Sequence, residues 1–208
     1  LIRLFDFAGV TGADDLKSLV VKWIDPAINN TDEDAGQIFK NSDLKATEEI
    51  LPVLEFFYKD ESGPSLKAKE IYGKIKDLIT VYGDGRVNIN TAAEETLGIL
   101  INSSIDELIK NGGITVRPDP QNLVHLISAA RKDAPFKDSG ALSSALFSTN
   151  LSSEEKNVLN KLIEIVIFKS NNFRINSTGE ITGKSISKTI TCIFSRSPAN
   201  KIIYWHEN

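Results

Sequence analysis

The chain has 208 residues, of which 41% are hydrophobic and 25% charged, and its formal net charge is −4. This is ordinary globular composition, with enough chain for one large domain or two small ones. The negative balance argues against a surface built to neutralise phosphates or anionic lipid. A lone cysteine, Cys192, excludes an internal disulfide and thiolate metal clusters, and its apolar neighbours predict that it is buried.

The first part of the chain is predicted to form a series of short helices. Residues 11–14 (TGAD) fit a capping box, and the residues that follow place four apolar side chains on one helical face: Leu16, Leu19, Val20 and Trp23. Asp25-Pro26 ends this helix, because a residue before proline avoids the helical region. Further helices are expected from Thr47 to Tyr58, with Pro52 near its first turn, and from Lys67 to Leu78.

A polar acidic loop, NNTDEDAG, separates the first two helices. Asn30, Asp32 and Asp34 present oxygens at alternate positions, which is the spacing at the start of an EF-hand loop. However, Gly36 falls one place late and the twelfth position is Asn41 instead of Glu. Two interpretations stay open here: a solvated acidic loop, or a calcium site with Asn30, Asp32 and Asp34 as ligands.

A short strand passes directly into a helix after residue 86. Val87 and Ile89 alternate with Asn88 and Asn90, a period of two that predicts a strand with one apolar face. Residues 91–94 (TAAE) then fit a second capping box. We expect the two asparagines to bond backbone groups that neither element satisfies. A catalytic role is disfavoured, because an amide cannot act as an acid or base near neutral pH.

The patterning changes from helical to extended near Ile163. Before it, residues 105–109 and 122–131 are predicted helices, and a capping box at Ser152–Glu155 opens another that runs to about Leu162. After it the chain is rich in Ile, Thr and Phe with short turns, which is typical of an antiparallel meander.

The predicted fold class is therefore α+β. A mainly helical part covers residues 1–160, with sub-parts of about 1–82 and 83–150, and the strands of the sheet lie in 161–208.

The search for catalytic motifs is negative. His125 lies among apolar residues of a predicted helix and is expected in the core or at its boundary, whereas His206 is expected at an exposed strand end. There is no glycine-rich phosphate loop, no G-x-S-x-G and no C-x-x-C. The sequence predicts no enzyme, no catalytic residues and no required cofactor.

Four motifs carry a resemblance to a known family: GVTGADDLKSLVVKWIDP (9–26), KIKDLITVYGDGRVNINTAAEETL (74–97), RKDAPFKDSGAL (131–142), and FKSNNFRINSTGEI (168–181) with the closing KIIYWHE (201–207). In this order, over nearly the whole chain, they resemble the K-type minor pseudopilin of bacterial type II secretion (general secretion pathway protein K).

This resemblance implies an architecture and a function. Its members carry an N-terminal hydrophobic pilin-type helix and first strands, then a large helical insertion, then the rest of a pilin-like sheet. They are non-enzymatic, anchored in the inner membrane, and sit at the tip of a periplasmic pseudopilus with the I- and J-type minor pseudopilins. Some bind calcium. Since the chain starts at Leu1 and contains no methionine, we expect a periplasmic fragment that lacks the pilin helix.

An alternative is a nucleic-acid module. The run N-I-N-T-A-x-x-E-x-L also opens helix-hairpin-helix domains of the DNA-uptake type, and the helical part is expected to consist of helix-hairpin-helix or SAM-like pieces. Such domains grip phosphate with the amides of a glycine-rich hairpin. Residues 102–105 (NSSI), where that hairpin is expected, contain no glycine, and Arg131-Lys132 is the one close basic pair downstream. Nucleic-acid binding is therefore not expected.

Overall fold

The computed structural model describes residues 1–24, 44, 46–59, 61–183, 186–197 and 199–207. Within them the protein is α+β, as predicted. It has eight α-helices: α1 (Ile2–Ala8), α2 (Ala13–Ile24), α3 (Leu51–Phe57), α4 (Pro64–Ile75), α5 (Glu94–Lys110), α6 (Pro120–Asp133), α7 (Ser139–Phe147) and α8 (Ser153–Ile165). A 3-10 helix, η3 (Thr47–Ile50), precedes α3. The strands are β1 (Val87–Asn88), β2 (Val166–Ile167), β3 (Asn172–Glu180), β4 (Ser187–Ser195) and β5 (Lys201–Glu207).

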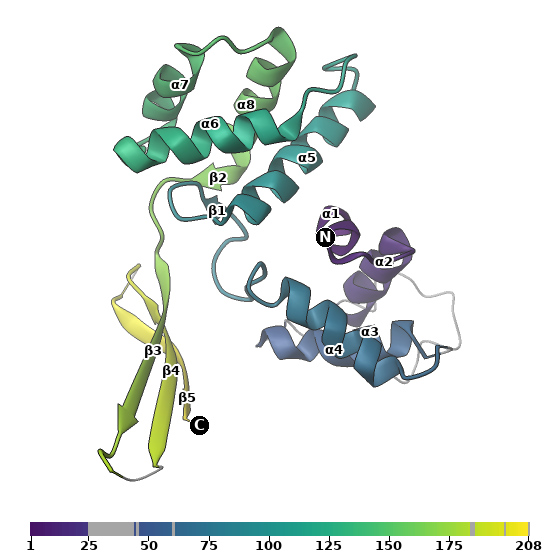
Figure 1. The fold of residues 1–208 in the computed structure, drawn as a ribbon, viewed down its shortest axis with the longest axis vertical. Helices are drawn as coiled ribbons and strands as arrows, with labels where there is room; N and C mark the ends of the chain where they lie inside the picture. The colour runs from purple at the N-terminus through teal and green to yellow at the C-terminus, as the bar shows by residue number, and fades with distance from the viewer. Residues whose placement is uncertain (25–43, 45, 60, 184–185, 198, 208) are drawn as a thin grey trace.

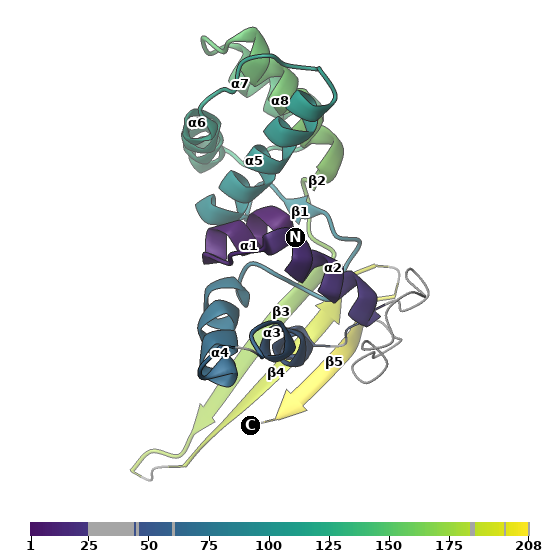
Figure 2. The same cartoon turned by 90° about the vertical axis from the view of Figure 1, so that its right-hand side faces the viewer.

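The elements form two helical lobes and a separate sheet (Figures 1 and 2). Helices α5–α8 form the lobe at one end of the molecule, which we call the upper lobe. Helices α1–α4 form the lower lobe, which lies beside the sheet of β3, β4 and β5. No helix among the described residues combines the length and apolar character that crossing a bilayer requires.

The lower lobe has its own apolar core. Its largest buried side chains come from all four helices: Phe5, Leu16, Leu54, Ile71 and Ile75. The predicted helix at residues 47–58 is present but divided into η3 and α3, because Pro52 lacks an N–H and is tolerated only where a helix begins. The capping box predicted at 11–14 is wrong: α2 begins only at Ala13, after Gly12 with φ of 78°.

The upper lobe encloses a second core built around α5. Its fully buried members include Leu97, Ile101 and Ile105 of this helix. The helix begins at Glu94 with no side-chain cap, so the capping box predicted at 91–94 is also wrong. The amides of residues 91 and 92 both bond the Asn88 carbonyl at 3.1 and 2.9 Å, which holds them in a turn and delays the helix.

The remaining helices of the upper lobe meet the predictions in part. The capping box of α8 is confirmed, with Ser152 and Glu155 bonding each other's backbone N–H groups. This helix runs to Ile165, beyond the predicted end, and α7 was not predicted. His125 is exposed on α6, so its predicted place in the core is wrong.

The strands divide into two sheets. The antiparallel meander is confirmed for β3, β4 and β5, in that order. The prediction that the antiparallel strands begin near Ile163 is wrong. Helix α8 continues to Ile165, and Val166 and Ile167 then form β2, which pairs in parallel with β1. This two-residue pairing closes the upper lobe and leaves the three-stranded sheet outside it.

Candidate assembly surface

The register of the three-stranded sheet places its side chains on two faces of opposite character. Pairing of Arg174 with Ile193 and of Ile193 with Tyr204 puts these three side chains on one face. Pairing of Ile175 with Cys192 and of Cys192 with Trp205 puts the next three on the other. Alternation along each strand extends both faces.

The first face, which we call the polar face, is turned toward the lower lobe. Besides Ile193 it carries mainly polar side chains: Arg174, Asn176, Thr178, Thr189, Thr191, Ser195, Tyr204 and His206. Residues of all three strands on this face line a cavity whose opposite wall is made by η3 and the connection between α4 and β1. The ring of Tyr204 lies 6.0 Å from that of Tyr82 in this connection.

The second face, which we call the apolar face, is turned away from the lower lobe. Its apolar residues come from all three strands and the two ends of the β3–β4 turn: Phe173, Ile175, Ile181, Ile186, Ile190, Cys192, Phe194, Ile202 and Trp205. A register shift between Ile193 and Phe194 leaves Ile203 without a partner in β4. Trp205 is 52% exposed and Ile175 is 47% exposed, while Cys192 between them is buried, as the sequence predicts. Exposed aromatic and aliphatic side chains on one continuous face mark an interaction surface.

Charged groups lie at the border of the apolar face. Lys188 pairs with Glu207 across β4 and β5 at 2.5 Å, and the Trp205 indole N–H donates to Glu207 at 3.2 Å. The hydrogen bond from Lys188, aided by that from Trp205, lowers the pKa of Glu207 below its usual range. Arg196 lies 5.6 Å from the ring centroid of Phe173 at the other end. An apolar centre with a polar rim is the usual anatomy of a protein interface.

The two asparagines of the strand-to-helix junction hold the sheet's attachment point. Asn90 donates its amide to the carbonyls of Phe136 and Phe168 at 2.9 and 3.0 Å, and accepts from the Phe136 N–H at 2.7 Å. Asn88 donates to the Ser170 hydroxyl at 2.9 Å, just before β3. The predicted structural role of both residues is confirmed.

The hairpin between α5 and α6 contains a pair of glycines, Gly112 and Gly113. This pair was not predicted from the sequence as the hairpin. Residues 102–105, where a hairpin was expected, lie inside α5. The chain turns instead at Asn111, Gly112 and Gly113, whose N–H groups bond the Glu107, Ile109 and Leu108 carbonyls at 2.8–3.1 Å. Arg131 donates to the Ala92 carbonyl at 2.6 Å. These hairpin amides and this guanidinium are therefore engaged within the protein.

The calcium ligands suggested by the sequence, Asn30, Asp32 and Asp34, lie outside the described residues. Within the described part of the chain, no three acidic, histidine or cysteine side chains gather in a way that would hold a metal ion. His206 is exposed on β5, as predicted, and lines the cavity. The structure does not bring His125 near it.

A scan against protein-family models finds no match for this chain, and searches of curated proteins and of solved structures find none either.

Proposed function

We propose that this chain is the periplasmic part of a K-type minor pseudopilin that works by assembly, without catalysis, at the tip of a type II secretion pseudopilus. The four motifs in family order support the proposal, and so does the general plan of a helical body followed by an antiparallel sheet. In this proposal the partners are the I- and J-type minor pseudopilins.

The observation that carries the proposal is the outward-facing apolar face of the sheet. A sheet with one apolar face must bury that face against another layer. Among the described residues, the helices of the lower lobe lie on the polar side of the sheet and do not supply this layer (Figure 1). A pilin-type helix of the kind that the family resemblance implies would be an amphipathic layer suited to it.

The bulk of the helical body suggests where the subunit sits. Two lobes mounted beside one small sheet would obstruct the addition of another subunit above it. We therefore place the subunit at the end of the filament. Without the pilin helices, contacts between the globular domains of the tip subunits are expected to be small and weak.

The DNA-binding alternative has less support from the described residues. A helix-hairpin-helix grips phosphate with free hairpin amides, whereas the amides at Asn111, Gly112 and Gly113 already bond carbonyls of α5. The net charge of −4 also opposes attraction to a polyanion. A fluorescence-anisotropy titration with duplex DNA should show no sub-micromolar binding at moderate salt.

Co-purification tests the proposal directly. The membrane-anchored protein should co-purify with the I- and J-type pseudopilins encoded in the same genome, and deletion of its gene should stop secretion. If it captures neither partner and the deletion leaves secretion intact, the assignment is wrong.

Trp205 provides a local test of the apolar face. In a Trp23→Phe background, Trp205 is the remaining tryptophan, since the chain contains two. Its emission should shift to the blue, and its quenching by acrylamide should fall, in the anchored protein compared with the 208-residue chain. Unchanged emission would mean that the face is not where the helix packs.

A further inference from the structure

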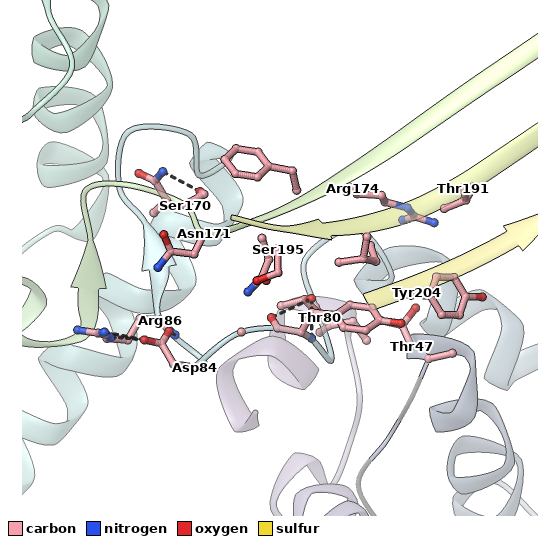
Figure 3. A pocket seen from close by; sticks show the side chains of 18 of the residues that line it. Thr47, Thr80, Asp84, Arg86, Ser170, Asn171, Arg174, Thr191, Ser195 and Tyr204 are labelled. Atoms are coloured by element: carbon pink, nitrogen blue, oxygen red, sulfur yellow. Dashed lines mark hydrogen bonds and ion pairs between the residues drawn. The ribbon is translucent and has the colours of Figure 1, made fainter. Parts of the chain in front are cut away.

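A cavity of about 1070 Å³ lies between the polar face of the sheet and the α4–β1 connection (Figure 3). Arg174, Thr191 and Tyr204 come from the sheet, and Thr47 and Thr80 come from the opposite wall. Small-molecule sites usually measure about 300–1,000 Å³. The cavity therefore has room for a ligand of several linked rings.

Neutral hydrogen-bonding groups dominate the lining. Hydroxyl and amide side chains come from both walls: Thr47, Thr80, Thr191, Ser195, Asn171 and Asn172. A hydroxyl donates one hydrogen bond and accepts two, and a side-chain amide both donates and accepts. Such a lining is complementary to a ligand that is itself rich in hydroxyl groups.

Two tyrosines, one from each wall, pack against each other at the edge of the cavity. The rings of Tyr82 and Tyr204 have centroids 6.0 Å apart and are tilted by 48°. Burial raises the pKa of Tyr82, so its hydroxyl stays protonated. A tyrosine offers an apolar ring face beside a polar tip, which suits the mixed apolar and hydroxylated surface of a sugar ring.

Arg174 forms no ion pair within the described part of the chain. The lining also carries the carboxylates of Glu48 and Asp77 and the amines of Lys76 and Lys169. The Arg174 guanidinium, on the sheet wall, lies close enough to Tyr82 of the opposite wall to oppose the rise that burial causes in the pKa of Tyr82. The nearby Asp84 is occupied by Arg86, at 2.6 Å. A guanidinium presents a planar fork of donors that matches a carboxylate with two parallel hydrogen bonds.

The sheet wall disfavours an extended peptide as the ligand. Thr191, Ile193 and Ser195 in this wall belong to the central strand, whose backbone groups are paired with β3 and β5. A peptide that binds by strand addition needs the unpaired backbone of a sheet edge, whereas this cavity lies against the face of the sheet and is lined by side chains of all three strands.

We propose that this cavity binds an acidic saccharide, with Arg174 holding its carboxylate and Tyr82 and Tyr204 lying against its rings. This binding activity goes beyond the assembly function and does not depend on it.

Titration calorimetry on the 208-residue chain tests the proposal with uronic acid trisaccharides of galacturonate, mannuronate and guluronate. At least one should bind, and Arg174→Gln should weaken its binding about tenfold or more. Tyr204→Ala should also weaken it, whereas Tyr204→Phe should retain most of the affinity. The matched control Lys188→Gln removes one positive charge from the opposite face of the sheet and should change the affinity less than about twofold.

Two further ligands identify what the cavity recognises. Maltotriose has the hydroxyls without the carboxylate and should bind about tenfold more weakly than the acidic trisaccharide. Triglutamate has carboxylates without sugar rings and should bind weakly as well. The proposal is overturned if none of the three uronic trisaccharides binds, if Arg174→Gln binds as well as the unchanged chain, or if either comparison ligand binds as tightly as the best trisaccharide. Circular dichroism verifies that each variant is folded.

Discussion

The helical lobes of this protein bury most of their large apolar side chains, whereas the three-stranded sheet leaves many of its own exposed. Each lobe surrounds its own cluster of fully buried side chains, such as Leu16 and Ile71 in the lower lobe and Ile101 and Leu123 in the upper. The sheet buries little and leaves Trp205 and its neighbours in water. Each lobe therefore buries its apolar side chains within itself, whereas the sheet leaves apolar side chains of one face exposed.

The largest effect is expected from truncation in a helical core. Ile101→Ala in α5 removes a fully buried side chain and should lower the free energy of unfolding by about 2–5 kcal/mol. Ile109→Ala, on the same helix but 41% exposed, is the matched control and should cost under about 0.5 kcal/mol. Urea denaturation measures both. Equal losses of unfolding free energy for the two variants would show that the upper lobe does not bury Ile101 in a core of its own.

The next effect tests how the sheet is attached to the upper lobe. Asn90→Ala removes its hydrogen bonds to the Phe136 N–H and to the carbonyls of Phe136 and Phe168, which should cost about 1–3 kcal/mol in unfolding free energy. Asn176→Ala removes an exposed amide that accepts from Thr191 on the sheet, and should cost under about 0.5 kcal/mol. A negligible loss for Asn90→Ala in urea denaturation would contradict the role of the junction.

Local sequence rules predicted the features that depend on neighbouring residues. The Ser152–Glu155 capping box and the asparagine junction follow from fixed spacings and side-chain chemistry, and both are present. The helix-hairpin-helix alternative requires a hairpin at residues 102–105, but α5 continues through them, with Asn102 and Ser104 bonding the carbonyls four residues back. Polar side chains that bond their own helix look like a loop in the sequence.

Features that depend on distant pairing were not predictable from the sequence. The β1–β2 pair joins residues from opposite ends of the upper lobe, and two residues give no periodic signal. Ile190 to Phe194 in β4 are apolar at most positions, so alternation does not tell which face is outward. The register with β3 and β5 decides this and defines the candidate surface.

A smaller effect, dependent on pH, is expected where the two helical lobes meet. Asp106 of α5 accepts hydrogen bonds from Arg117, at 2.6 Å, and from Arg3 of α1. Partial burial alone raises the pKa of Asp106, but the bonds from Arg117 and Arg3 outweigh it and hold the pKa below its usual range. Because the pKa is lower in the folded state, the stabilisation is present above the unfolded pKa of about 3.9 and is lost as the pH falls through the folded pKa.

Asp106→Asn should therefore lower the unfolding free energy at pH 7 by up to about 1 kcal/mol, since the three side chains are partly exposed. The difference between variant and unchanged chain should shrink as the pH is lowered to 3. Urea denaturation at both pH values measures it. A difference of the same size at the two pH values would exclude an origin in the Asp106 charge.

The smallest change in unfolding free energy is expected for a substitution on the apolar face. This substitution tests most directly whether the sheet differs from the lobes in burial. In a Trp23→Phe background, Trp205 fluorescence reports unfolding of the sheet. Ile175→Ala should change the unfolding free energy by under about 0.5 kcal/mol, because this side chain is 47% exposed in the folded chain. Ile193→Ala, one register position away on the polar face and 7% exposed, should cost at least about 1 kcal/mol.

If both substitutions cost the same free energy of unfolding, the apolar face is already covered within this chain and the contrast between lobes and sheet fails. If Ile175→Ala is neutral here but destabilising in a membrane-anchored protein of the kind proposed, the proposed pilin-type helix covers this face.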